Sequence, residues 1–372
     1  MLTFSDILPN EWDIIKALTP QQYLSWRLRQ SFEQNKAHYA KMEDIGCELV
    51  YINNCCDIVC VDPSKFWAFV GDDIPDEIKS RLIKDLEVMT NPSRPGLLDD
   101  VVRISLKLTG DAKGRLEQIP VGLASIPIFN AGAGPVPMGG EVIIINDGLR
   151  AGIDFLTGYY SKISDELSEG TENIEDIIEA FITNSDEVGA IFCAINGIAS
   201  KVDSMPRFPI MYTEEQEAGI RRLNNMLMFF VLLHEYGHVI LGHVEELRCS
   251  SPEWKLSKSE LRKRYSKMRK WEIEADIWAC NCLVSNVGSE RRNESILYLA
   301  HIYAILHISY SLLRSEVGVL ETHPSGEDRY NNIMKSFKFS RVERSEAKNI
   351  KDLWYLIATA SGITVDRWSV SS

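Results

Sequence analysis

Residues 232–243, LLHEYGHVILGH, constrain the fold more than any other stretch, because they place ionisable side chains inside an apolar helix. Three of the seven histidines of the chain lie in these twelve residues. The preceding segment, Met226–Leu233, is apolar on nearly all faces, so a helix predicted from Glu214 to about Leu241 must run through the interior. Buried histidines and a buried glutamate need partners. A metal ion would supply them.

The H-E-x-x-H pattern within this helix indicates how the ion would be held. His234 and His238 are four residues apart, share one helix face and can bind the same ion. Glu235 is offset by about 100°, which places its carboxylate beside the ion and predicts a general base. On a continued helix His243 would point about 140° away from His238, so we exclude it as a ligand. We expect it to end the helix with Gly242 and to form a local hydrogen bond.

A third ligand is predicted in the segment WEIEADIWAC, residues 271–280. Glu272 and Asp276 are four residues apart on a predicted helix and share a face. We expect Glu272 to bind the metal and Asp276 to accept the free ring N–H of a ligand histidine. Ala275 is small enough for the two helices to approach, and Glu274 points elsewhere. Two imidazoles and one carboxylate favour a single zinc ion, with manganese or cobalt as alternatives.

A fourth segment, LETHPSGEDRYNNI at residues 320–333, predicts a rigid loop that leads into a helix. His323 lies in the loop and is a candidate catalytic residue, because an imidazole there could stabilise an oxyanion. Arg329 follows in the first turns of the helix and is expected to pair with a carboxylate near the site. Three tyrosines are alternatives to His323 for the oxyanion: Tyr303, Tyr310 and Tyr330.

The remaining patterns predict an α+β fold. A helix is expected from Pro20, with a capping box formed by Thr19 and Gln22, and is followed by short antiparallel strands between Cys47 and Val61 and at 66–70. Residues 75–90 predict an amphipathic helix. Residues 101–108, VVRISLKL, predict a strand.

The glycine-rich stretch Asn130–Gly140 predicts a flexible loop or hinge, because its glycines lack the lysine and hydroxyl residues of a phosphate-binding loop. It leads into a β-branched strand, EVIIIN. We expect residues 1–130 to form an N-terminal mixed region of helix and strand, whose role the residues do not indicate, and residues 131–372 to form a mainly helical domain.

Composition narrows the class of protein. The net charge of −13 argues against broad nucleic-acid binding. No stretch reaches the roughly 18 apolar residues of a membrane span. The N-terminal residues lack the charged and apolar regions of a signal peptide. Eight cysteines without C-x-x-C spacing are typical of reduced thiols, so a cytoplasmic protein is expected. An acidic run at 163–189 and a basic run at 251–270 predict solvated helix faces.

Four blocks in order, EVIIINDGL, HEYGHVILGH, EIEAD and THPSGEDR, resemble the gluzincin metallopeptidases, particularly the CAAX prenyl endopeptidases and their heat-shock relatives. The resemblance implies a zincin-like core with one zinc ion on His234, His238 and Glu272, Glu235 as general base and Asp276 behind a ligand. It also implies an antiparallel edge strand that binds the substrate backbone. That strand would be formed by Glu141, Val142, Ile143, Ile144, Ile145 and Asn146.

The CAAX prenyl endopeptidase group is usually embedded in a membrane, whereas this chain has no predicted span. Among soluble proteins, the chain resembles the phage-exclusion peptidases of the Lit type. This resemblance implies a regulated zinc endopeptidase in phage defence, with a protein substrate such as the translation factor elongation factor Tu. The rival hypothesis is a zinc-stabilised sensor or binding module whose basic segment, residues 255–270, binds a nucleotide or nucleic acid. Glu235 and Asp276 argue against the rival, because a structural zinc site needs no general base.

Overall fold

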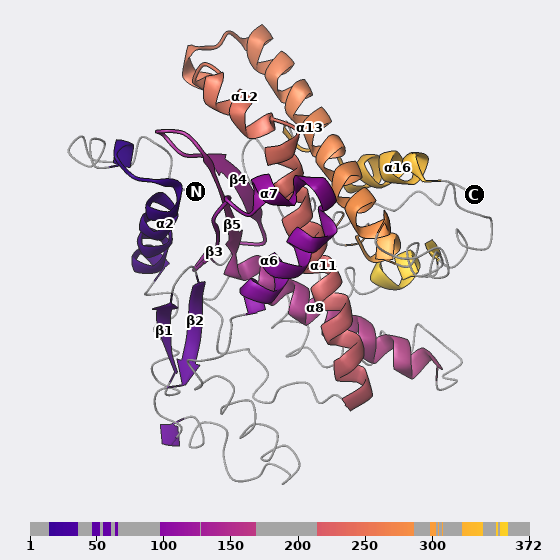
Figure 1. The fold of residues 1–372 in the computed structure, drawn as a ribbon. Coiled ribbons are helices and arrows are strands. Elements are labelled where there is room, and N and C mark those ends of the chain that lie inside the picture. Colours follow the sequence, from indigo (N-terminus) through magenta and orange to yellow (C-terminus); the bar gives the residue numbers. More distant parts are fainter. Residues whose placement is uncertain are drawn as a thin grey trace.

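The computed structural model describes residues 15–35, 47–52, 55–60, 64–65, 97–126, 128–168, 214–285, 298–302, 304, 307, 322–337, 347–348 and 350–355. The described part is mostly helical with a small mixed sheet, in agreement with the predicted α+β class (Figure 1). Its longer helices are α2 (Pro20–Asn35), α6 (Leu97–Leu108), α8 (Asp147–Ser168), α11 (Glu214–Ile240), α12 (His243–Cys249), α13 (Lys258–Ser285) and α16 (Gly326–Ser336). The strands are β1 (Cys47–Ile52), β2 (Cys55–Cys60), β3 (Val121–Ala124), β4 (Ala131–Pro135) and β5 (Glu141–Asn146).

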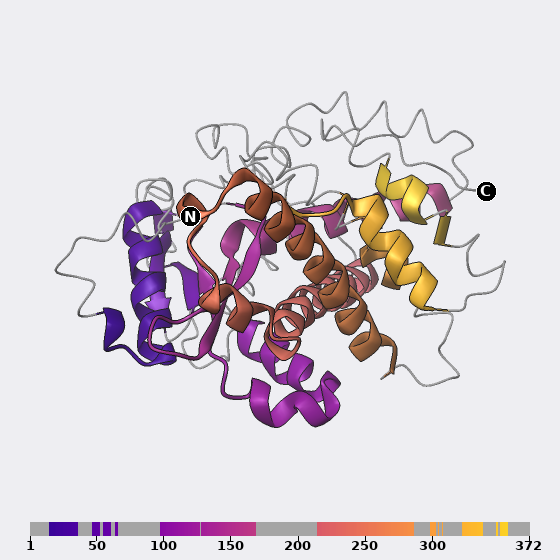
Figure 2. The same cartoon turned by 90° about the horizontal axis from the view of Figure 1, so that it is seen from above.

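Helix α11 forms the centre of this architecture. Its bounds agree with the helix predicted from Glu214 to about Leu241, and it contacts α6, α8 and α13 as well as strands β4 and β5. Helix α13 also contacts α16, so α16 joins the same group of helices (Figure 2). The main core gathers apolar side chains from α6, β3, β5, α8, α11 and α13. Sheet and core thus include residues on both sides of position 130; the division there stays a prediction.

The predicted edge strand lies in the centre of its sheet. The strand order is β3-β5-β4, with β5 parallel to β3 and antiparallel to β4. The prediction that Glu141–Asn146 is an edge strand is therefore wrong. Its run of β-branched residues fits the central position, because such runs are typical of strands that are largely buried. Val142, Ile143 and Ile145 are all at most 3% exposed.

The edge next to the helices is formed by β4, which comes from the glycine-rich stretch predicted as a loop or hinge. That prediction is wrong for Ala131–Pro135, which pairs in register with β5. Alanine and glycine have little strand propensity of their own, and it is the ladder to β5 that holds the segment extended. The rest of the stretch makes the turn between the two strands, with positive φ angles of 109° and 88° at Gly139 and Gly140.

Residues 101–108 form part of helix α6, not the predicted strand. The buried residues Leu98, Val101, Ser105 and Thr109 recur every three or four positions, which is the spacing of a helix face. The helix also begins earlier than the strand-like stretch, with Asp99 and Asp100 in its first turn, where acidic side chains favour a helix. The alternation within VVRISLKL was too short to identify the period.

Several local predictions are confirmed. Thr19 and Gln22 form the capping box of α2, with the Thr19 N–H donating to the Gln22 side chain at 2.9 Å and the Gln22 N–H to the Thr19 hydroxyl at 3.3 Å. Strands β1 and β2 are antiparallel. The predicted strand at 66–70, the predicted helix at 75–90 and most of the acidic run lie outside the described residues.

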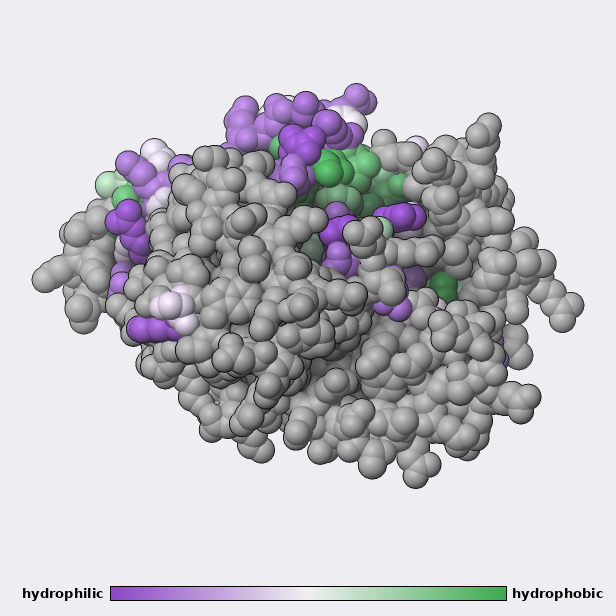
Figure 3. Space-filling model, turned by 90° about the horizontal axis from the view of Figure 1, so that it is seen from below, coloured by the Kyte–Doolittle hydropathy of each residue, from purple (hydrophilic) through white to green (hydrophobic). Residues whose placement is uncertain are grey.

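Few of the large hydrophobic side chains in the described residues are exposed. Viewed from below, hydrophobic side chains gather beside a hydrophilic projection (Figure 3). Of the described large hydrophobic side chains, Met138, Leu241 and Trp254 are exposed. None of the described helices has by itself the length and apolarity of a membrane span; only α11 and α12 taken together, with a 52° bend between them, meet both criteria.

A buried histidine next to α8 leads to a prediction about pH. The indole N–H of Trp354 donates to His301 Nδ1 at 2.8 Å, and burial lowers the pKa of His301 to about 3. The unfolded chain binds this proton near pH 6.5, so it binds more protons than the folded chain between about pH 6.5 and 3. The free energy of unfolding should therefore fall with decreasing pH in this window, by about 1.4 kcal/mol per unit from this group. In urea titrations between pH 6 and 4, His301→Asn should lower that slope; an unchanged slope would contradict the assignment.

Candidate metal centre

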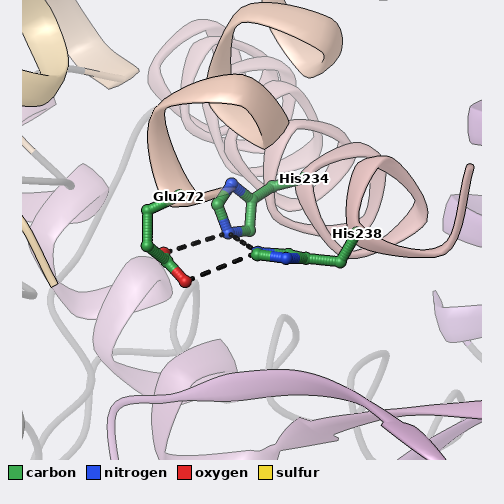
Figure 4. Close-up of side chains that lie close together, drawn as sticks. All are labelled: His234, His238 and Glu272. Carbon is green, nitrogen blue, oxygen red and sulfur yellow. Dashed lines mark hydrogen bonds and ion pairs between the residues drawn. The ribbon is translucent and has the colours of Figure 1, made fainter. Parts of the chain in front are cut away.

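Helices α11 and α13 bring three predicted ligands together. His234 and His238 project from one face of α11, and Glu272 faces them from α13 (Figure 4). The two Nε2 atoms lie 3.1 Å apart, and each is 3.5 Å from a different oxygen of the Glu272 carboxylate. The ligand atoms all lie within 4.8 Å of one another, which forms a group that could hold a metal ion.

The two helices approach closely where Gly237 meets Ala275. A Cβ atom on Gly237 would lie 3.1 Å from the Ala275 Cα and 3.2 Å from its carbonyl oxygen. This agrees with the prediction that Ala275 is small so that the helices can approach. The close approach matters for the site, because Gly237 directly precedes His238 and Ala275 lies one turn after Glu272.

The same substitution at two glycines of α11 tests this contact. Gly219→Ala should raise the free energy of unfolding by up to about 1 kcal/mol, because alanine favours a helix and nothing lies within 4 Å of the new Cβ. Gly237→Ala should instead lower it by about 1–3 kcal/mol, because the backbone of α13 must move. Urea denaturation of both variants gives the comparison. If Gly237→Ala raised the free energy of unfolding as much as Gly219→Ala does, the contact between Gly237 and Ala275 would not limit how closely the helices approach.

His234 is held from behind by an acid and an arginine. Its Nδ1 lies 2.9 Å from Asp276 Oδ1, and the guanidinium of Arg329 donates to both Asp276 oxygens at 2.6 Å. Asp276 is fully buried. Burial acts to raise the pKa of its carboxyl, but Arg329 and His234 hold it below its usual value. Asp276 thus lies where it was predicted, and Arg329 pairs with a carboxylate at the site as expected.

His238 is held by a different pair of residues. Its Nδ1 lies 3.1 Å from His243 Nδ1, and His243 Nε2 lies 3.3 Å from Glu274 Oε2. Helix α11 ends at Ile240, and Gly242 adopts a left-handed φ of 79° before α12 starts at His243. The expected helix end and local hydrogen bond are both present. Sequence reasoning did not find that the bond reaches a predicted ligand, because it treated His243 as part of a straight helix.

The donor set fits a divalent metal. With Nδ1 of His234 donating to Asp276 and Nδ1 of His238 directed at His243, the neutral form of each ring presents a lone pair at Nε2. Two such lone pairs 3.1 Å apart repel each other unless a proton or a metal ion lies between them and Glu272. Burial acts to lower the pKa of His234, yet hydrogen bonds to Asp276 and Glu272 raise it to about 10, whereas burial lowers the pKa of His238 to about 3. Near neutral pH the pair therefore takes up one proton, on His234.

Glu235 lies beside the cluster without belonging to it. Its side chain is buried, and the backbone N–H of Ala133 in β4 donates to it. Burial raises the pKa of Glu235 to about 7, with the charge of Glu272 acting in the same direction. A carboxyl group poised near neutral pH suits proton transfer. Through its hydrogen bond with Ala133, Glu235 also connects helix α11 to strand β4.

His323 lies near the cluster, at the start of the segment that carries Arg329. Its Nε2 is 3.8 Å from Glu272 Oε1, its Nδ1 is 2.8 Å from the Thr322 hydroxyl, and its side chain is 32% exposed. Helix α16 follows, capped by the Ser325 side chain. Tyr330 is buried on α16, whereas the other two tyrosines considered for the oxyanion lie outside the described residues.

Strand β4 presents one unpaired edge next to Glu235. The Asn146 N–H donates to Asn130 and the Val136 N–H to Gly140, both at 3.0 Å, so the paired positions alternate and residues 131, 133 and 135 face away from β5. Two of their N–H groups are engaged, that of Ala131 by the Asn130 side chain and that of Ala133 by Glu235. Pro135 has none. No other described strand pairs with this edge.

The basic segment, residues 255–270, runs from η5 (Glu253–Lys255) into the first half of α13 and projects beside α12 at the top of Figure 1. Several of its charges have acidic partners. Lys267 pairs with Glu246, Lys270 with Glu274 at 3.2 Å, and Arg264 lies 3.9 Å from Glu253. These pairs reduce the charge that the segment offers to an external ligand.

Comparison with known proteins bears on the helical part of the chain. Residues 201–349 match the family model described as Peptidase U49. This span contains both predicted ligand histidines, Glu235, Glu272 and Arg329. No curated protein and no solved structure matches the chain. The segment that carries the His-His-Glu cluster is thus similar to a peptidase family, which supports a hydrolase that acts on peptide bonds.

Proposed function

We propose that this chain is a zinc-dependent endopeptidase with His234, His238 and Glu272 as its metal ligands. The observation that carries the proposal is the convergence of these three side chains with Glu235 beside them, in the segment similar to a peptidase family. Two histidines and one glutamate form a known catalytic zinc set, which leaves a position for water or substrate. The resemblance of the motifs to gluzincins supports the same assignment.

A bound zinc ion would polarise the scissile carbonyl and lower the pKa of a bound water to near 7. Glu235 would accept the proton of that water and deliver it to the leaving amine. Its buried carboxylate is held by Ala133, so it cannot turn away from the site without losing that bond. His323 would donate a hydrogen bond to the oxyanion, since it lies beside Glu272 and remains partly exposed. Asp276 and Arg329 orient His234.

The substrate would bind as an extended strand along β4. This assignment replaces the predicted Glu141–Asn146, because β5 is paired on both edges. The outward carbonyls of Ala131 and Ala133 can accept hydrogen bonds from a substrate backbone. Glycine at positions 132 and 134 leaves open space where side chains would be, with nothing within 4 Å of a Cβ built at either position. A protein segment placed there would pass Glu235.

Labelling of new protein N-termini in cells tests the proposal directly. Cells that express the wild type should contain termini that are absent from cells with the Glu235→Gln variant at equal expression. Those termini identify the substrate, and a cut in elongation factor Tu during phage infection would establish the defence role. If zinc is bound but no such terminus appears with or without phage, the proposal of an endopeptidase is wrong. The rival, a binding module that uses residues 255–270, then becomes the working hypothesis.

A further inference from the structure

His238, the second predicted ligand histidine, is hydrogen-bonded to its own set of residues, separate from the set that holds His234. We infer that His243 and Glu274 are positioning residues, which orient the His238 ring and determine which of its nitrogens faces the metal. The inference rests on the proposed zinc site. It assigns a role to two residues that lie outside the H-E-x-x-H and E-x-x-x-D patterns.

The geometry fixes the His243 ring in one plane. His243 stacks on Trp271 with ring centroids 5.0 Å apart and planes 14° from parallel, and its side chain is 5% exposed. Within that plane one ring nitrogen faces His238 at 3.1 Å and the other faces Glu274 at 3.3 Å. Lys270 lies 3.2 Å from the second Glu274 oxygen and holds the carboxylate in place. The ring cannot rotate without losing both contacts.

The proton positions in the hydrogen-bonded series from Glu274 through His243 to His238 follow from the chemistry of its two ends. At one end, a carboxylate can only accept, so His243 Nε2 carries a proton that it donates to Glu274. A neutral imidazole then has an acceptor at Nδ1. At the other end, His238 can bind a metal through Nε2 only if its single proton is on Nδ1. That proton points at the His243 acceptor. Both ends therefore require the same placement of protons, and the Nε2 lone pair of His238 then faces Glu272.

The turn at Gly242 makes this arrangement possible. A straight helix would carry His243 about 140° away from His238. The left-handed φ of Gly242 breaks the helix and starts α12 at His243, which returns the ring to the back of His238. The Nδ1 of each predicted ligand histidine is thus linked to an acid of α13. Asp276 serves His234 directly, and Glu274 serves His238 through the His243 ring.

Zinc affinity of the full chain, measured by competition with a chromophoric chelator, tests the assignment with two variants of His243. His243→Phe keeps a ring on Trp271 but has no acceptor, and it should weaken zinc binding about 10–100-fold, the usual cost of losing such a partner. His243→Asn retains an acceptor near the Nδ1 position and should bind zinc close to the wild type. Glu274→Gln should weaken binding less than His243→Phe, and Glu246→Gln, an exposed glutamate of α12, should leave it unchanged.

The histidine ring signals in a ¹⁵N spectrum report the proton positions, which a merely structural role would not fix. His243 should carry its proton on Nε2 and His238 on Nδ1. Wild-type zinc affinity in a folded His243→Phe variant, or a proton on Nδ1 of His243, would overturn the inference. If His243→Phe does not fold, the spectrum and the partly exposed Glu274→Gln variant decide. A wild type that binds no zinc would instead refute the proposed function.

Discussion

Glu235→Gln is expected to lower peptide cleavage by about 10²- to 10⁴-fold while one zinc ion stays bound per chain. Glutamine has nearly the shape of glutamate and keeps an oxygen that can accept from the Ala133 N–H. It cannot take a proton from water, however. The fold should be retained, because burial raises the pKa of the Glu235 carboxyl to about 7 and a neutral side chain is tolerated there.

The measurements for this variant are the rate of cleavage of the substrate found by N-terminal labelling and the zinc content of the purified protein. Glu246→Gln is the matched control, because it makes the same chemical change at an exposed position of α12. Loss of zinc from Glu235→Gln would mean that Glu235 binds the metal. Full activity with zinc bound would remove Glu235 from the reaction.

Glu272→Ala is expected to weaken zinc binding by more than about 100-fold, since losing a ligand costs more than losing an outer partner of a ligand. The two histidines would remain on α11 without the carboxylate that faces them from α13. Binding to the folded state alone stabilises a protein by about 4 kcal/mol when the free metal is at a thousand times its dissociation constant. The wild type should show this gain on addition of zinc, and the variant should gain at most about 1.4 kcal/mol at the same concentration, because the metal is then at no more than about ten times the dissociation constant of the variant.

Thermal or urea unfolding with and without zinc measures the difference. Glu246→Ala serves as the control, because it removes a glutamate that takes no part in the cluster. An equal zinc-dependent gain in wild type and Glu272→Ala would exclude Glu272 from the site. The absence of any gain in the wild type would argue against a zinc site altogether.

The candidate site could be predicted from the sequence because its predicted ligands lie on two helices at spacings that the helix itself enforces. A separation of four residues puts His234 and His238 on one face whatever the rest of the chain does. The same holds for Glu272 and Asp276 on α13. The buried setting followed from the apolar residues around them. Local geometry therefore sufficed to pair His234 with His238 and Glu272 with Asp276, and the order of the two motifs along the chain predicted that the pairs meet.

Other features were decided only by tertiary contacts. A glycine-rich stretch has no local reason to be extended, and it is the ladder to β5 that makes Ala131–Pro135 the edge strand. The strand EVIIIN was predicted at an edge, and pairing with its two neighbours places it in the centre. In α6, contact with α11 selects one helix face of a stretch that alternates like a strand.

The residues that share a helix face, and hence the side chains that could meet at one ion, follow from the sequence because the α-helix has a fixed period. The groups behind and beside those side chains depend on tertiary contacts. The tertiary structure turned His243 back onto His238 at Gly242 and set the Ala133 N–H against Glu235. Those contacts join segments through turns and sheet pairing, whose geometry depends on the whole packed core and not on local spacing.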